Sequence, residues 1–321
     1  KAVMGIEINP GLDKSDFKIV YSPQHGADNI PVRTCLKRLG YDIVPVLAQC
    51  APDPDYTNTK SPNPEVDASY ELAIKLAKEV DADVVAITDP DGDRLGVVAK
   101  HNGEYVLMSG NQSAAVYLEY ILSQRKEKGT LPDNAVMYNT IVTSDLGELV
   151  ARNYGVDVEK TLTGFKFIGD KIRKYEKTHE KQFIFGYEES YGCVVEDFVR
   201  DKDAVQAVLL AAECGNYYKK QGKDLIDVLN ELYAKYGTFK ESQIALAKAG
   251  AAGAARIKEM MDTLRKDKPT EIGGVKVVLS EDYATSERSD GTTIDLPKSN
   301  VLKYYLEDGS WIAARPSGTE P

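Results

Sequence analysis

The sequence has few cysteines, and none of them are arranged as metal or redox motifs. The four cysteines, Cys35, Cys50, Cys193 and Cys214, form no C-x-x-C pair and no zinc-binding spacing. This pattern is typical of reduced thiols in a cytosolic protein and does not favour disulfides or a metal centre. A cytoplasmic location is therefore expected.

Long apolar runs and an excess of positive charge are also lacking. No stretch reaches the roughly 18 consecutive apolar residues that span a bilayer, and the opening KAVMGIEINPGLDK contains no signal-peptide core. Lys and Arg number 40 against 50 Asp and Glu, a net charge of −10. This balance disfavours nucleic acid or a membrane surface as a partner. A small anionic substrate held by a local group of Arg and Lys remains compatible with it.

The order of apolar segments predicts an α/β protein with more than one domain. The chain of 321 residues is too long for one ordinary core. Strand-like and helix-like segments alternate twice, which predicts two successive α/β domains with mixed or parallel sheets, at 1–128 and 129–240. Pro31 and Gly40 bound one helix, and Ser144 is the expected N-cap of another. Residues 241–321 predict a smaller, incomplete α+β domain.

Three aspartates follow a buried strand in the segment VVAITDPDGDRLGVV, residues 84–98. Asp89, Asp91 and Asp93 repel one another unless a cation lies among them. A calcium hand is excluded, because its glycine and glutamate positions hold Arg94 and Lys100. A hard-cation site at the end of a strand is the favoured interpretation. A dehalogenase-type phosphotransferase with Asp89 as nucleophile stays open.

The segment DPDGDRLG resembles the metal-binding loop of the α-D-phosphohexomutases, the phosphoglucomutase and phosphomannomutase family. Two further segments agree with this resemblance, in the order that the family has them: GYEESYG (186–192) is similar to its sugar-binding loop, and RPSGTEP (315–321) to its phosphate-binding loop. The resemblance covers essentially the whole chain.

The resemblance implies a role for each loop. Asp89, Asp91 and Asp93 would bind Mg²⁺, and Glu188 and Ser190 would hold two adjacent sugar hydroxyls. The phosphate loop would enclose the non-reacting phosphate with a forked cation, two hydroxyls and a backbone amide; these belong to Arg315, Ser317, Thr319 and Gly318. By weaker analogy, Thr163 and Gly164 belong to a sugar-specificity loop. Arg94 and Lys202 are the candidate catalytic residues, with Lys202 as general acid or base.

The resemblance implies a mutase that interconverts hexose 1-phosphate and hexose 6-phosphate of glucose or mannose. A phosphoserine beside the metal would donate its phosphoryl group, and a hexose 1,6-bisphosphate would be the intermediate. Pentose phosphate specificity also remains open. The family's Ser-His-Asn-Pro-type loop is not found; Ser22 is followed by Pro-Gln-His. We therefore expect a fragment that lacks the N-terminal phosphoserine domain and is inactive alone. A non-catalytic sugar-phosphate-binding module is the second alternative.

Overall fold

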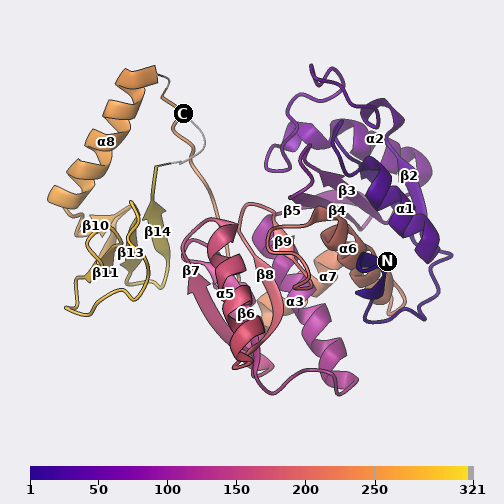
Figure 1. Cartoon of the computed structure of the whole chain (residues 1–321). Coiled ribbons are helices and arrows are strands. Elements are labelled where there is room, and N and C mark those ends of the chain that lie inside the picture. Colours follow the sequence, from indigo (N-terminus) through magenta and orange to yellow (C-terminus); the bar gives the residue numbers. More distant parts are fainter. Residues whose placement is uncertain (249, 317–321) are drawn as a thin grey trace. The chain divides into compact units, whose positions relative to one another are not determined.

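The computed structural model describes residues 1–248 and 250–316. The chain divides into two compact units, Lys1–Lys240 and Glu241–Pro321 (Figure 1). Within the described residues, no helix combines the length and the apolar character needed to cross a membrane.

The first unit begins with a mixed sheet of five strands in the order β2-β1-β3-β4-β5. Its parallel part consists of β1 (Lys18–Ser22), β2 (Asp42–Pro45) and β3 (Val84–Thr88). The strands β4 (Leu95–His101) and β5 (Glu104–Met108) follow as an antiparallel hairpin. Every residue of β3 is buried, as expected for a central strand that lacks polar alternation.

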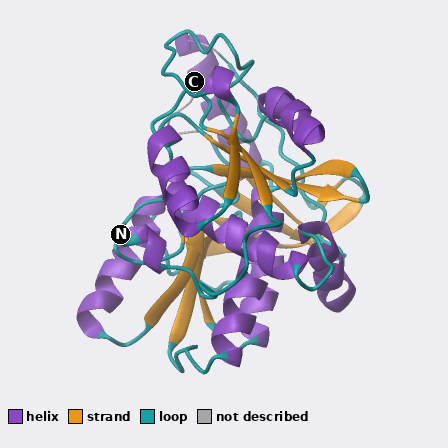
Figure 2. Cartoon of the chain, turned by 90° about the vertical axis from the view of Figure 1, so that its right-hand side faces the viewer, coloured by secondary structure: helices purple, strands orange, loops and turns teal. Residues whose placement is uncertain are grey.

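Helices cover both faces of this sheet (Figure 2). Ile19 and Tyr21 of β1 face one core, and Val20 faces a second core beneath α2, which follows from the alternation of side chains along a strand. Gly40 ends α1 in the left-handed conformation at φ 92°, as predicted. The helical elements are η1 (Val3–Gly5), α1 (Asn29–Leu39), η2 (Leu47–Gln49), η3 (Asp67–Tyr70) and α2 (Glu71–Val80).

A second mixed sheet has the order β7-β6-β8-β9. The parallel strands are β6 (Ala135–Thr140), β7 (Asp157–Thr161) and β8 (Gln182–Tyr187), and β9 (Cys193–Val194) is antiparallel to β8. The helices are α3 (Gly110–Glu127), α4 (Leu146–Asn153), α5 (Phe165–Thr178), α6 (Ala204–Lys219) and α7 (Leu225–Tyr236).

The predicted N-cap of α4 is wrong by one residue. Asp145 occupies the N-cap position, and its side chain makes no capping bond. Its carboxylate instead accepts a hydrogen bond from Lys160 at 2.9 Å. The hydroxyl of Ser144 still accepts a long hydrogen bond, 3.4 Å, from the amide of Leu146. The lysine explains the missing capping bond, because its ammonium engages the carboxylate that would otherwise accept from the first turn.

The two sheets of the first unit share one hydrophobic core. Apolar residues from β1, β3 and β4 and from β6 and β8 belong to the same cluster, together with those of α1, α3, α6 and α7. Helix α6 contacts β3, β4 and α1 on one side and β9, α3 and α7 on the others. It is buried around most of its circumference, as expected for a helix that is apolar all round. This helix fixes the two sheets relative to each other.

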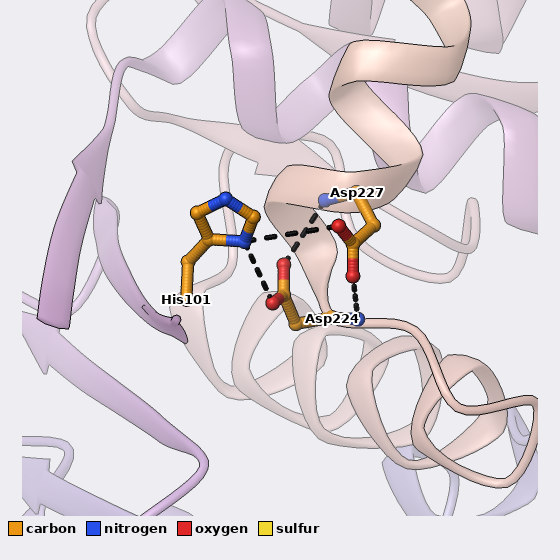
Figure 3. Close-up of side chains that lie close together, drawn as sticks. All are labelled: His101, Asp224 and Asp227. Atoms are coloured by element: carbon orange, nitrogen blue, oxygen red, sulfur yellow. Dashed lines mark hydrogen bonds and ion pairs between the residues drawn. The ribbon is translucent and has the colours of Figure 1, made fainter. Parts of the chain in front are cut away.

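A polar contact also joins the two halves of this unit (Figure 3). Nδ1 of His101, at the end of β4, lies 2.8 Å from a carboxylate oxygen of Asp224 and 3.8 Å from one of Asp227. The same two aspartates form the capping box of α7. The β4-β5 hairpin is thereby held against the N-terminus of α7.

The second unit is a small antiparallel sheet with one described helix. Its elements are α8 (Gly250–Lys266), β10 (Glu271–Ile272), β11 (Val275–Asp282), β12 (Glu287–Arg288), β13 (Leu302–Leu306) and β14 (Trp311–Ala314). Met261 of α8 packs against Leu302 and Tyr304 of β13. The predicted fold class, two successive α/β domains followed by a smaller α+β C-terminal domain, is confirmed, and strands predominate in the C-terminal domain.

The Gly215→Ala substitution tests how closely α6 is fitted to the first sheet. A Cβ at this position would lie 2.7 Å from the ring of Phe17. Alanine favours a helix by about 1 kcal/mol over glycine, but crowding in a packed core costs about 1–3 kcal/mol. We expect a net loss of stability in urea denaturation. A Phe17→Leu background makes room and should reduce the loss, whereas equal losses in both backgrounds would contradict this packing.

Candidate functional site

The aspartate loop lies between β3 and β4, at the carboxyl end of the parallel strands. Asp89 follows β3 directly and is buried, with 6% of its surface exposed. Its Oδ1 accepts hydrogen bonds from the amides of Asp93 and Arg94, both at 3.0 Å. Gly92 takes φ 76°, and a Cβ there would lie 2.6 Å from the carboxylate of Asp28. The loop therefore folds back on its first aspartate and requires glycine at its tip.

The three aspartates converge as predicted. Asp89, Asp91 and Asp93 each offer a carboxylate oxygen, and these oxygens lie within 4.8 Å of one another. Burial, with the charges of Asp93 and Asp91, raises the pKa of Asp89 to about 7. Among the described residues, Oδ1 of Asp93 is buried and has no hydrogen-bond donor. Three converging carboxylates, of which Asp89 is buried, Asp93 half-buried and Asp91 exposed, suit a hard divalent cation.

A further carboxyl group, buried and missed in the sequence, lies close to this loop. Asp28 precedes α1 and is 7% exposed. Burial and the neighbouring charges of Asp203, Asp91 and Asp93 raise its pKa to about 7. No local pattern pointed to it, because its neighbours come from distant parts of the chain.

Arg94 extends across the aspartates. Its Nη1 donates to Oε1 of Glu65 at 2.9 Å, while its Nε lies 3.6 Å from Asp89 and 3.7 Å from Asp93. The guanidinium is therefore held beside the carboxylates but makes a direct hydrogen bond only with Glu65 in this group.

Lys202 joins the aspartate loop to the segment GYEESYG. Its Nζ lies 2.9 Å from Oδ2 of Asp93 and 3.8 Å from Oε2 of Glu188. Burial would lower the pKa of Lys202, but the hydrogen bond that its ammonium donates to Asp93, with the nearby negative charges, outweighs burial and raises that pKa. Gly192 leaves space for the lysine stem, since a Cβ there would lie 2.1 Å from it. The side chain is therefore a half-buried ammonium between two loops.

The two sugar segments predicted from the sequence lie against each other. Glu188 is 4% exposed, and its Oε1 accepts a hydrogen bond from the amide of Gly164 at 2.7 Å. Ser190 lies in a turn between Glu188 and Gly192. The turn is closed by a hydrogen bond of 2.9 Å from the amide of Glu188 to the carbonyl of Gly192. The hydroxyl of Thr163 is buried without a hydrogen-bond partner among the described residues. A ligand hydroxyl could meet this group.

The phosphate segment lies in the second unit. Arg315 follows β14 directly. Ser317, Gly318 and Thr319 lie outside the described residues. Their grouping with Arg315 stays a prediction.

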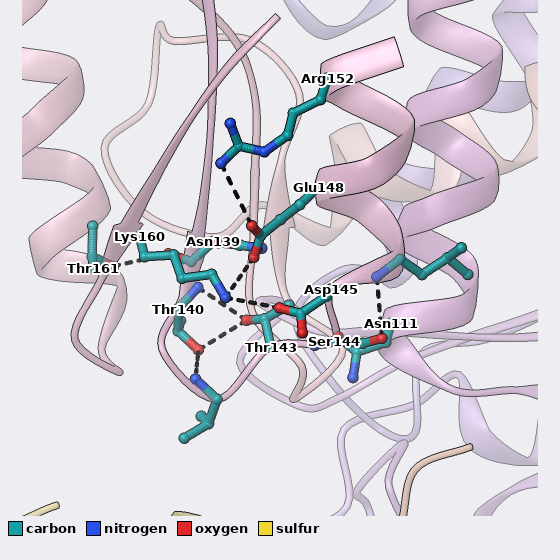
Figure 4. A network of polar contacts seen from close by, with 12 residues as sticks. Asn111, Asn139, Thr140, Thr143, Ser144, Asp145, Glu148, Arg152, Lys160 and Thr161 are labelled. Atoms are coloured by element: carbon teal, nitrogen blue, oxygen red, sulfur yellow. Dashed lines mark hydrogen bonds and ion pairs between the residues drawn. The ribbon is translucent and has the colours of Figure 1, made fainter. Parts of the chain in front are cut away.

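A network of polar side chains supports the second sheet's carboxyl edge (Figure 4). Nζ of Lys160 lies 2.6 Å from Glu148 and 2.9 Å from Asp145. Burial would lower the pKa of Lys160, but these two carboxylates outweigh it and raise that pKa. The amide of Thr140 donates to Oγ1 of Thr143 at 2.9 Å. Lys160 thus ties the end of β7 to the start of α4, and Thr143 closes the turn that follows β6.

Glu189 is a further residue that sequence reasoning missed. It stands between Glu188 and Ser190, and its Oε2 accepts hydrogen bonds from the hydroxyls of Thr140 at 2.9 Å and Thr143 at 3.4 Å. Both threonines are fully buried. The doubled glutamate in GYEESYG was the available signal: one carboxylate faces Lys202, and the other anchors the turn.

The comparisons with known proteins agree with this arrangement. Residues 6–103 match the family described as phosphoglucomutase/phosphomannomutase, alpha/beta/alpha domain II. Residues 109–236 match alpha/beta/alpha domain III of the same family.

Curated relatives include the phosphoglucomutase of Staphylococcus haemolyticus, 37% identical over 97% of this chain and 57% of that protein. The phosphoglucomutase of Staphylococcus epidermidis is 38% identical over the same shares. The chain thus spans a little over half the length of these relatives.

Solved structures share the fold. The phosphoglucomutase pp63/parafusin of Paramecium, in its open form, has a TM-score of 0.63 at 18% identity, covering 99% of this chain and 53% of that one. A phosphoglucomutase/phosphomannomutase family protein of Burkholderia thailandensis has a TM-score of 0.59 at 17% identity, covering 85% and 54%.

Fold and site together define an α/β protein in which a loop with three converging carboxylates follows a parallel strand. The chain belongs to the α-D-phosphohexomutase family, the phosphoglucomutases and phosphomannomutases. This is a family of metal-dependent isomerases of carbohydrate metabolism.

Replacing Thr140 tests whether Glu189 anchors the turn. Thr140→Val keeps the shape but leaves a carboxylate with one donor fewer, which costs about 1–3 kcal/mol for a buried group. We expect faster amide hydrogen exchange across residues 188–191.

Thr161→Val is the matched control. Thr161 pairs with Thr140 in the sheet register, and its hydroxyl donates only to backbone carbonyls in the hydrogen bonds seen here. Equal acceleration by both variants would contradict a specific anchor.

Proposed function

We propose that this chain is part of a phosphohexomutase that interconverts the 1- and 6-phosphates of glucose or mannose, with hexose 1,6-bisphosphate as intermediate. The family and its phosphoglucomutase relatives support this. The observation that carries it is the meeting of the aspartate loop and the sugar segment at Lys202. A phosphoryl group and a sugar ring could be held side by side there.

We propose Mg²⁺ as the cation, bound by Asp89, Asp91 and Asp93. Their convergent oxygens and the buried Oδ1 of Asp93 without a donor fit an oxygen-binding ion. When bound, Mg²⁺ supplies positive charge that stabilises the transferring phosphoryl group.

The other proposed roles in binding and catalysis belong to side chains and backbone groups of this chain. Arg94 presents a fixed cation beside the aspartates, where it would contact the phosphoryl oxygens. Lys202, held as an ammonium, would protonate the sugar oxygen when that oxygen leaves the phosphoryl group, and in the opposite half-reaction its neutral amine would accept the proton of the attacking hydroxyl. Glu188 and Ser190 would bind two adjacent sugar hydroxyls, with Thr163 and Gly164 bordering the ring. Arg315, Ser317, Gly318 and Thr319 would bind the non-reacting phosphate.

The phosphoryl donor is proposed to lie outside this chain, on a phosphoserine in another domain of the same protein. Ser22 does not match that role in sequence, and it is fully buried with its hydroxyl donating to Gln49 at 2.6 Å. We therefore expect this chain alone to show no mutase turnover above background.

Calorimetric titration with glucose 1,6-bisphosphate in the presence of Mg²⁺ tests the proposed roles of Arg315 and Glu188 in binding. Arg315→Ala and Glu188→Ala each remove a charged hydrogen-bonding group, which contributes about 1.5–3 kcal/mol. Affinity should therefore fall by roughly 10- to 100-fold in each variant.

Two exposed residues provide matched controls. Arg256→Ala on α8 and Glu79→Ala on α2 remove the same charges at exposed positions, and both should leave affinity unchanged. Binding that neither site variant weakens would contradict the assignment. Release of inorganic phosphate would instead favour the phosphatase interpretation with Asp89 as nucleophile.

A further inference from the structure

Glu65 is the direct partner of Arg94, although the two residues lie 29 positions apart in the chain. Oε1 of Glu65 accepts from Nη1 of Arg94 at 2.9 Å, and the two side chains are 27% and 28% exposed. A partly shielded carboxylate–guanidinium contact of this length is a charge-assisted hydrogen bond, which fixes orientation as well as position.

The backbone that carries Glu65 is itself held in place. Oδ1 of Asn63 accepts from the amide of Glu65 at 3.0 Å. The carbonyl of Asn63 accepts from the amide of Val66 at 3.0 Å and from the hydroxyl of Ser69 at 2.7 Å. These bonds close a tight turn around Pro64, so the position of Glu65 does not depend on its contact with Arg94.

This turn is fastened to the strand that follows Arg94. The hydroxyl of Tyr70, a residue that is 1% exposed, donates to the carbonyl of Pro64 at 2.7 Å. On β4, a Cβ at Gly96 would lie 1.9 Å from that hydroxyl and 3.0 Å from Pro64. Glycine two residues after Arg94 therefore lets the turn approach β4 closely. Glu65 and Arg94 are positioned by one packed unit.

Arg94 has competing partners within reach. Its Nε is buried, makes no hydrogen bond among the described residues, and stands 3.6 and 3.7 Å from the carboxylates of Asp89 and Asp93. A small rotation would close both distances to hydrogen bonds. The guanidinium would then occupy the oxygens that are proposed to bind the cation.

We propose that Glu65 is a positioning residue that holds Arg94 back from Asp89 and Asp93 and so keeps these carboxylates available to a divalent cation. The proposal rests on the proposed function for the cation site. Without Glu65, the freed guanidinium would pair with the two aspartates and compete with the cation for them.

The test is Mn²⁺ binding to the whole chain, measured by the electron paramagnetic resonance of free Mn²⁺. We expect Glu65→Ala to weaken Mn²⁺ binding by about tenfold, within the range of coupling between residues in contact. Glu65→Gln, which keeps an acceptor for Nη1, should restore most of the affinity. Glu71→Ala removes an exposed glutamate at the start of α2 that pairs with Lys60, and it should leave affinity unchanged.

Removing the glutamate also removes negative charge near the site, and this direct effect must be separated from positioning. We therefore compare Glu65→Ala in the wild-type and Arg94→Ala backgrounds. If Glu65 acts through Arg94, the substitution should change Mn²⁺ affinity by less than about twofold once Arg94 is absent. Circular dichroism and thermal unfolding verify that each variant is folded.

The outcomes distinguish this inference from the function on which it rests. Equal losses in both backgrounds, or no loss in either, would overturn the positioning role and leave the cation site standing. Failure of the unsubstituted chain to bind Mn²⁺ would overturn the cation site and the inference with it. A loss confined to the background that contains Arg94, reversed by Glu65→Gln, supports the proposal.

Discussion

The crowding of negative charge at the carboxyl end of β3 is the constraint on which the arrangement of this region depends. Asp89, Asp91 and Asp93 meet there, close to the buried Asp28. Carboxylates this close are tolerated only with positive charge among them. Arg94 comes from the same loop, but Lys202 comes from the second α/β layer. The charges at the end of β3 therefore require Lys202, from the second α/β domain, to lie close to Asp93.

Apolar packing and polar contacts contribute differently to the position of the two α/β domains. The shared core around α6 brings the two sheets together, because apolar burial is the large and non-directional part of the folding free energy. It does not by itself select which loops meet. Direction comes from polar contacts at the rim: the amide of Ala204 donates to the carbonyl of Gly92, and that of Leu95 to the carbonyl of Tyr191. A partly buried ion pair such as Lys202–Asp93 adds little net stability, but an arrangement that separated the two charges would leave each without its partner.

Much of the fold was predictable because its signals are local. The buried run of β3, the helix stop at Gly40 and the glycine at the tip of the aspartate loop each depend on a few adjacent residues. The convergence of Asp89 with Asp91 and Asp93 follows in the same way from their alternate spacing. A local pattern failed where a distant charge competed, as at the start of α4, where Lys160 pairs with Asp145.

The residues that sequence reasoning missed depend on partners far along the chain. Glu65 belongs to no motif in the sequence, and its role appears only when the fold brings it to Arg94 beside β4. Glu189 likewise acquires a role only when β6 places two buried hydroxyls beneath it. Both are acidic residues whose partners lie on separate elements, so no spacing rule could identify them. They share a physical logic: a carboxylate on a rigid turn orients a neighbouring group that faces the site, and it does so without lying in the site itself. A sequence motif identifies the residues that would contact a ligand, whereas the residues that orient them, such as Glu65 and Glu189, are identified only from the fold.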